Sequence, residues 1–122
     1  MLNLDTHIVL HLLAGSLNTS ELSLLRGQRL GVSSIVLWEL AKLKQLGRIA
    51  QGPDEPAVAA FLRECTIWEI DAEVAVQSTR LDFRGDPADE LVAATSIVHH
   101  VPLLTRDSVI RSSLMVPLAH LS

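Results

Sequence analysis

The chain has 122 residues, 48% of them apolar, and its 10 lysines and arginines are outnumbered by 14 acidic residues, for a net charge of −4. This is the length of one domain, spanning residues 1–122, with enough apolar side chains for a core. The negative balance argues against a domain that binds nucleic acid mainly through a basic surface but leaves a nuclease open, because a bound metal reverses the local field. The lack of tyrosine argues against a base-stacking platform.

Short strand-like apolar runs alternate with stretches of helical spacing along the chain. Ser, Thr and Asp before these stretches, and Gly after several of them, are helix-boundary signals. We predict strands over residues 1–4, 29–32, 65–70, 101–105 and 115–118. We predict helices over about residues 6–14, 20–27, 34–46, 57–64, 71–81, 88–99 and 108–111.

This alternation predicts an α/β fold, a three-layer α/β/α sandwich around a mostly parallel sheet of four to five strands. The connections should be right-handed crossovers. Pro117 in the last predicted strand favours a place at the edge of the sheet.

The single cysteine, Cys65, cannot form an internal disulfide, which fits a reducing cytoplasm. Asp5, His7 and His11 interrupt the N-terminal apolar stretch, so we expect no basic-then-apolar leader. No apolar run approaches the roughly 18 residues of a membrane span. We therefore expect a cytoplasmic protein with no membrane partner.

Four acidic residues lie where an apolar run ends or on the inward face of a predicted helix: Asp5, Glu39, Asp89 and Asp107. Acids at strand ends reach one rim of an α/β sheet, where such folds place ligands. Carboxylates that converge there repel one another unless a cation is present. Mg²⁺ and Mn²⁺ prefer such oxygen ligands. A metal ion held this way activates water and neutralises charge on phosphorus, so the pattern points to phosphate chemistry.

Each acid has a simpler interpretation when it is taken singly. Asp5 and Asp107 are suited to cap the helices that follow them. Asp86 precedes Pro87 and is most simply a helix cap, and Asp89 then lies in a first turn that favours negative charge. Glu39 shares a helical stripe with Ile35 and Leu43, where a carboxylate must be paired, bind a metal or lie at the margin and reach water.

Several stretches together resemble the PIN-domain nucleases, most closely the VapC-type toxins of bacterial toxin–antitoxin pairs. The similarity covers nearly the whole chain, and its specificity comes from the order and spacing of motifs that are individually weak. The matching stretches are residues 4–7, 33–40, 46–49, 85–89, 93–95 and 101–107.

The resemblance implies an Mg²⁺- or Mn²⁺-dependent endoribonuclease with Asp5, Glu39, Asp89 and Asp107 as the catalytic, metal-binding acids. It also implies a structural role for Asp86, and a role for Thr105 in orienting a carboxylate or a water. Glu90 stands where related chains commonly have arginine, which affects local substrate contacts more than metal binding. A homodimer, an RNA substrate and a cognate antitoxin that covers the acidic groove are further expectations.

Three other hypotheses are compatible with parts of the pattern. The first is a non-catalytic interaction module of the same fold, favoured by the acidic net charge and by Glu90. The second is a DNA-directed nuclease with the same metal chemistry, which we rank below RNA because the chain has no room for a helical arch. The third, a phosphate-accepting receiver domain, ranks low because Asp5 has no adjacent acid and Arg106, not lysine, follows the late strand.

Other polar residues have ordinary structural explanations. His99 and His100 are expected in a helix C-terminal turn, and Cys65 is expected to be inert. Trp38 and Trp68 are expected to pack in the core or at an interface. Candidate phosphate contacts are Lys42, Lys44, Arg48, Arg84, Arg106 and Arg111.

Overall fold

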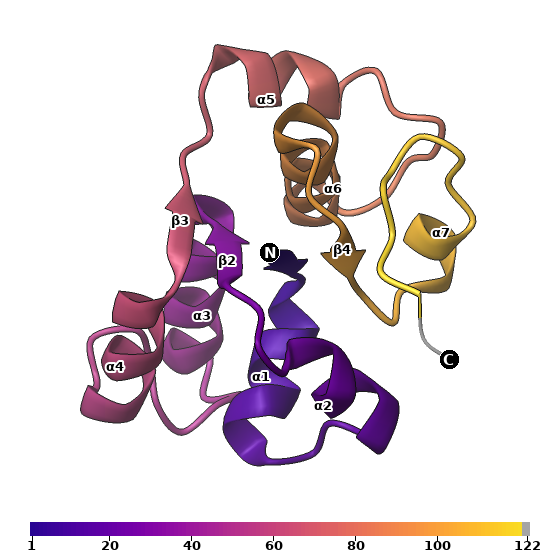
Figure 1. The fold of residues 1–122 in the computed structure, drawn as a ribbon. Helices are drawn as coiled ribbons and strands as arrows, with labels where there is room; N and C mark the ends of the chain where they lie inside the picture. The colour runs from indigo at the N-terminus through magenta and orange to yellow at the C-terminus, as the bar shows by residue number, and fades with distance from the viewer. Residues whose placement is uncertain (121–122) are drawn as a thin grey trace.

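The computed structural model describes residues 1–120, which form a four-stranded parallel sheet with helices around it (Figure 1). The sheet order is β3-β2-β1-β4, with every neighbouring pair parallel. The strands are β1 (Leu2–Leu4), β2 (Leu30–Ser33), β3 (Thr66–Trp68) and β4 (Leu103–Leu104). The helices are α1 (Thr6–Ala14), α2 (Thr19–Leu25), α3 (Ser34–Gln45), α4 (Pro56–Glu64), α5 (Ala72–Ser78), α6 (Pro87–His99) and α7 (Ser108–Arg111).

The strand order explains why helices cover both faces of the sheet. The chain moves outward from β1 to β2 and β3, and then returns past β1 to β4. Right-handed crossovers therefore place α1 to α4 on one face and α5 and α6 on the other, and Figure 1 shows these two groups on opposite sides of the strands. The predicted α/β/α sandwich is confirmed, with the smaller of the two expected strand numbers.

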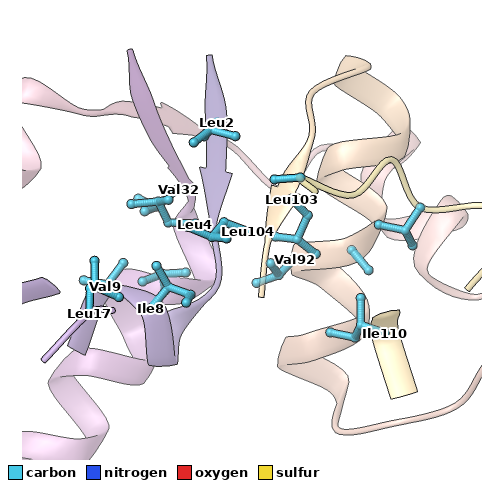
Figure 2. Packing of buried hydrophobic residues seen from close by; sticks show 14 of the residues in the cluster. Leu2, Leu4, Ile8, Val9, Leu17, Val32, Val92, Leu103, Leu104 and Ile110 are labelled. Atoms are coloured by element: carbon cyan, nitrogen blue, oxygen red, sulfur yellow. The ribbon is translucent and has the colours of Figure 1, made fainter. Parts of the chain in front are cut away.

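The middle strand β1 has a polar and an apolar side. Asn3 faces α6, where its Nδ2 donates to the backbone oxygen of Val92 (3.1 Å) and to Oγ of Ser96 (2.9 Å). Because side chains alternate along a strand, Leu2 and Leu4 face the opposite layer. Leu4 pairs with Leu104 of β4, and Figure 2 shows these two leucines side by side within the core.

Three predicted elements are shorter in the structure by three residues or more, each for a local reason. The strand over 65–70 stops at Trp68, because its partner β2 ends at Ser33 where α3 begins. The helix over 71–81 stops at Ser78, where the hydroxyls of Ser78 and Thr79 bond back to helix carbonyls. The strand over 101–105 keeps only the two residues that pair with β1.

The predicted last strand, residues 115–118, is only a single parallel bridge between Leu118 and Leu103. The backbone N–H of Leu103 donates to the oxygen of Pro117 (2.8 Å), and the N–H of Ala119 donates to the oxygen of Leu103 (2.9 Å). Proline has no N–H to extend this ladder, so the pairing stops there. The predicted edge position is therefore right, but the predicted strand is wrong.

Candidate functional site

Asp5 lies at the point where β1 ends and α1 begins, and its side chain is 3% exposed. Its backbone N–H still donates to the oxygen of Leu104 (3.1 Å), so the residue is held by the sheet. Its Oδ1 accepts from the N–H of Thr6 (2.7 Å), which makes Asp5 the N-cap of α1. The capping interpretation is thus correct, and it leaves Oδ2 available for a second partner.

That second partner is Thr105, the buried residue that follows β4. Its hydroxyl donates to Oδ2 of Asp5 (2.7 Å) and accepts from the backbone N–H of Asp107 (3.0 Å). The half-buried Asp107 in turn caps α7, with Oδ1 accepting from the N–H groups of Val109 (2.9 Å) and Ile110 (3.1 Å). One hydroxyl thereby links the ends of two adjacent strands.

Glu39 approaches Asp5 from α3, and the hydroxyl of Thr6 donates to its Oε1. Burial, opposed by this hydrogen bond and reinforced by the charge of Asp5, raises the pKa of Glu39. The fully buried positions of α3 are Val36 and Leu40, so the half-buried Glu39 lies at the margin of the core-facing stripe. Leu46, the last residue of the predicted helix over 34–46, is 57% exposed just after α3 ends.

Asp89 and Asp86 come from the start of α6. Asp86 is exposed and caps the helix, with Oδ1 accepting from the N–H of Ala88 (3.0 Å), as its place before Pro87 predicts. Asp89 lies in the first turn and is half-buried. Burial raises the pKa of Asp89 to about 6, with further contributions from the negative charges of Asp5, Asp107, Glu39 and Asp86.

The carboxyl edge of the sheet therefore holds four acids from four separate segments, close enough to influence one another electrostatically: Asp5, Glu39, Asp89 and Asp107. Within residues 1–120, however, no group of three or more His, Cys, Asp or Glu side chains is already arranged to hold a metal ion. The donor set consists of hard oxygens under mutual repulsion, which fits Mg²⁺ or Mn²⁺. Their assignment as metal ligands stays a prediction.

Comparison with known proteins places this arrangement in a family. The family model described as the PIN domain matches residues 3–112, which include all four acids. The chain belongs to the PIN domain family. No curated protein sequence matches it significantly.

Several solved structures share this PIN fold, and one of them is described as a toxin–antitoxin complex from Klebsiella pneumoniae. VapBC2 from Rickettsia felis, bound to a promoter DNA fragment, is 20% identical with a TM-score of 0.74, covering 100% of both chains. DNA-bound VapBC from Salmonella typhimurium is 16% identical with a TM-score of 0.75, covering 97% of this chain and 96% of the other. FitAcB from Neisseria gonorrhoeae is 20% identical with a TM-score of 0.73, covering 98% and 97%. At these identities the likeness establishes the fold.

Sequence reasoning missed one buried acid of this PIN domain. Glu21 in α2 is 0% exposed and forms an ion pair with Arg106, whose Nη2 lies 2.6 Å from Oε1 of Glu21. The hydrogen bond from Arg106 lowers the pKa of Glu21. Arg106, one of the candidate phosphate contacts, donates two hydrogen bonds to Glu21 while 38% of its side chain stays exposed, so a contact with phosphate stays a prediction. The available signal was the capping pair formed by Asn18 and Glu21 before an apolar run.

Some of the other side chains singled out from the sequence have structural partners. His99 ends α6 and stacks on Trp68, with ring centroids 5.7 Å apart. Trp68 is 9% exposed and packs as expected, whereas Trp38 is 58% exposed. Lys44 pairs with Glu55 (3.1 Å). Cys65 is half-buried with a free thiol, and burial raises its pKa to about 11, in line with the expected inertness.

Over residues 1–120 no single helix is long and apolar enough to cross a membrane. Only α1 and α2 taken together, across a bend of 102°, reach that length and composition.

Proposed function

We propose that this PIN domain is the toxin of a type II toxin–antitoxin pair and acts as a metal-dependent endoribonuclease. The observation that carries the proposal is the buried Asp5, held by Thr6 and Thr105 at the carboxyl edge beside three further acids. Supporting it are the family to which the chain belongs and the shared fold with a toxin–antitoxin complex and with two DNA-bound VapBC structures.

Asp5, Glu39, Asp89 and Asp107 would hold the cation, which when bound supplies Lewis-acid activation of water and phosphodiester. The chain's own residues do the positioning. Thr105 orients Asp5 through a 2.7 Å hydrogen bond, and Thr6 orients both Asp5 and Glu39. Asp86 caps α6 and so fixes the first turn that carries Asp89. Asp5 and Asp89 are the assignments on which the proposal depends most.

The experiment is cleavage of a mixed RNA by the purified protein with Mg²⁺ or Mn²⁺, beside Asp5→Asn and Asp89→Asn variants of unchanged circular dichroism. We expect both substitutions to abolish cutting. A matched control is Asp71→Asn, which alters an exposed helix cap of α5 and should leave cutting intact. Wild-type activity in both site variants would reject the assignment.

The same purified protein can be used to distinguish a ribonuclease from a DNA-directed nuclease, and an enzyme from a non-catalytic interaction module. We expect cleavage of RNA in preference to DNA of the same sequence, and a Mn²⁺ isotherm in calorimetry that is lost in Glu39→Gln. A protein that binds no Mn²⁺ and cuts neither nucleic acid would instead be the non-catalytic interaction module.

An antitoxin is the protein partner in this proposal, and an apolar groove supports it. The groove has a volume of about 640 Å³ and lies between α1 and α4, with Leu10, Leu13, Ile49 and Val58 among its lining residues. A groove of this lining suits the apolar face of a partner helix. The gene immediately upstream is the one to test: where it encodes a small protein, co-expression should yield a complex, and Leu13→Glu should weaken it. Full retention by Leu13→Glu would exclude this groove.

A homodimer is the second assembly that we propose, and the exposed Trp38 supports it. Its indole lies on α3 next to an open apolar surface shared with Leu37, Leu62 and Ile67. Large aromatic side chains are enriched at protein interfaces. Light scattering should give the mass of two chains for the wild type and of one chain for Trp38→Glu. A dimeric Trp38→Glu would move the contact to another face.

A further inference from the structure

Glu21 is the one charged residue among 1–120 whose side chain is fully buried outside the acidic edge. It belongs to a capping box at the start of α2: its Oε1 accepts from the N–H of Asn18 (2.9 Å), and its own N–H donates to Oδ1 of Asn18 (2.8 Å). The first of these bonds holds the carboxylate of Glu21, and the second holds its backbone in the first turn of α2. A buried charge of this kind requires a partner with matching geometry.

Arg106 supplies that partner through both arms of its planar group. Its Nε donates to Oε2 of Glu21 (2.7 Å), and its Nη2 donates to Oε1 (2.6 Å). The same guanidinium reaches the backbone oxygen of Ser16 (3.4 Å), and its Nη1 lies 3.2 Å from Nε2 of His11. A two-armed contact with a carboxylate fixes direction as well as distance, which a single-point contact by lysine does not.

Arg106 also lies between two residues of the candidate site. Thr105 before it holds Asp5, and Asp107 after it caps α7. The strand β4 ends at Leu104, whose oxygen accepts the last backbone hydrogen bond from β1, donated by Asp5. Residues 105–107 therefore lie outside the sheet. Its backbone is held further by Arg111, whose Nη1 donates to the oxygen of Thr105 (3.1 Å). The anchor of Arg106 at Glu21 therefore acts on the segment between the two site residues.

The pair joins the buried carboxylate of Glu21 to an Arg106 side chain that is 38% exposed. Stability alone does not explain an ion pair at this place, because well-packed apolar residues often stabilise as much. We propose that the Glu21–Arg106 pair positions the acidic site by tethering residues 105–107 to α2. The tether holds the hydroxyl of Thr105 within hydrogen-bond distance of Asp5 and keeps Asp107 at the N-terminus of α7 as its cap. Glu21 and Arg106 are then positioning residues, not catalytic ones. The value of this tether for catalysis rests on the proposed function, whereas the tether itself does not.

The test is hydrogen exchange of the metal-free protein, read at the Val109 and Ile110 amides that Asp107 caps. Glu21→Gln keeps an oxygen for the capping box but removes the charge that Arg106 binds. We expect those two amides to exchange about tenfold faster in this variant, as for a locally opened segment. Arg106→Lys, which keeps the charge but not the fork, should give an intermediate rate.

A core variant of comparable stability separates positioning from general loosening. Val74→Ala removes buried methyl groups from α5 and should lower the melting temperature without accelerating these two amides. Should Glu21→Gln fail to fold, Glu21→Gln/Arg106→Met leaves no unpaired buried charge and should fold with the same fast exchange. Wild-type exchange in the folded Glu21 variant, or equal acceleration in Val74→Ala, would overturn the tether.

Mn²⁺ titration by calorimetry then connects the tether to the site. We expect Glu21→Gln to bind Mn²⁺ about tenfold more weakly than the wild type, the size of effect seen when a residue that orients metal ligands is lost. Val74→Ala should bind as the wild type does. A wild type that neither binds Mn²⁺ nor cuts RNA would reject the proposed function, while the exchange rates would still decide on the tether.

Discussion

The hydroxyl of Thr105 and the carboxylate of Asp5 are joined by a 2.7 Å hydrogen bond that spans 100 positions of sequence. Both side chains are buried, so no water is freely available to replace the bond. A buried carboxylate oxygen that loses its donor bears the cost of desolvation without compensation.

Replacing Thr105 with valine should therefore destabilise the metal-free protein by about 1.5–3 kcal/mol, since valine keeps the shape but removes both the donor to Asp5 and the acceptor of the Asp107 N–H. Urea unfolding measures this cost. The matched control is Thr95→Val, because the buried hydroxyl of Thr95 only bonds back to the oxygen of Leu91 in its own helix. Equal decreases in the free energy of unfolding for Thr105→Val and Thr95→Val would mean that the hydrogen bond to Asp5 contributes no more to stability than an ordinary bond within a helix.

Gly31 should not tolerate a methyl group. A Cβ at this position would lie 2.5 Å from two ring carbons of Trp68 and 3.0 Å from the backbone oxygen of Thr66. We expect Gly31→Ala to cost about 1–3 kcal/mol through overpacking, measured by urea unfolding.

A smaller residue at position 68 should relieve this clash. In the Trp68→Leu background the cost of Gly31→Ala should fall by about 1 kcal/mol or more, as for two coupled neighbours. Gly85→Ala, where a Cβ would meet nothing within 4 Å, should be neutral or slightly stabilising. Additive effects at positions 31 and 68 would argue that the indole can move aside freely.

Asp89→Asn should stabilise the metal-free protein at pH 7.5. The pKa of Asp89 in the folded state is about 6, above its ordinary value of 3.8, so its ionised form opposes folding. Protonation of Asp89 increases the free energy of unfolding as the pH falls below about 6. The increase is complete below pH 3.8, where the group is protonated in both the folded and the unfolded state. After allowance for solvent screening of a half-exposed group, we expect roughly 1 kcal/mol.

Melting curves in chelator between pH 4 and 7.5 check this prediction. The asparagine variant should melt higher at pH 7.5 and show a flatter pH dependence than the wild type. With saturating Mn²⁺ the order should reverse, because the variant loses a ligand. A variant that melts lower than the wild type even in chelator would show that Asp89 has a favourable partner in the folded protein.

Cys65 should react slowly with alkylating reagents. Burial raises the pKa of its thiol from 9.0 to about 11, so at pH 8 the thiolate is about 100-fold scarcer than for an unperturbed cysteine. Iodoacetamide labelling followed by mass spectrometry should be at least that much slower in the native protein than in urea. Similar rates in both states would indicate that Cys65 is accessible in solution.

Much of the fold was predictable because the signals are local. Gly15 and Gly47 follow helices with φ of 71° and 73°, as helix-ending glycines do, and Pro87 and Asp86 mark the start of α6. The strand lengths were not predictable, because they depend on pairing. Trp68 is the last paired residue of β3 only because Ser33 is the last residue of β2.

The four candidate acids could be named from the sequence, and their role as metal ligands stays a prediction, whereas the contacts among the residues around them could not be predicted. The ends of apolar runs pointed to Asp5 and Asp107, yet nothing local tells that Thr105 hydrogen-bonds to Asp5. Likewise nothing in the residues around Arg106 indicates an ion pair, and only the fold brings its guanidinium to Glu21. Contacts between segments that are distant in sequence follow from the topology of the fold. The pattern of adjacent residues along the chain does not contain that topology.

The short strands have a consequence for how this protein behaves at high concentration. One edge of the sheet is β3, which is three residues long. At the other edge, the segment around Leu118 pairs with Leu103 through a single bridge, and Pro117 has no N–H with which to extend that pairing. Fibril-forming segments need about six or seven residues of free strand. Neither edge offers that, so stacking of copies edge to edge is disfavoured by the architecture itself.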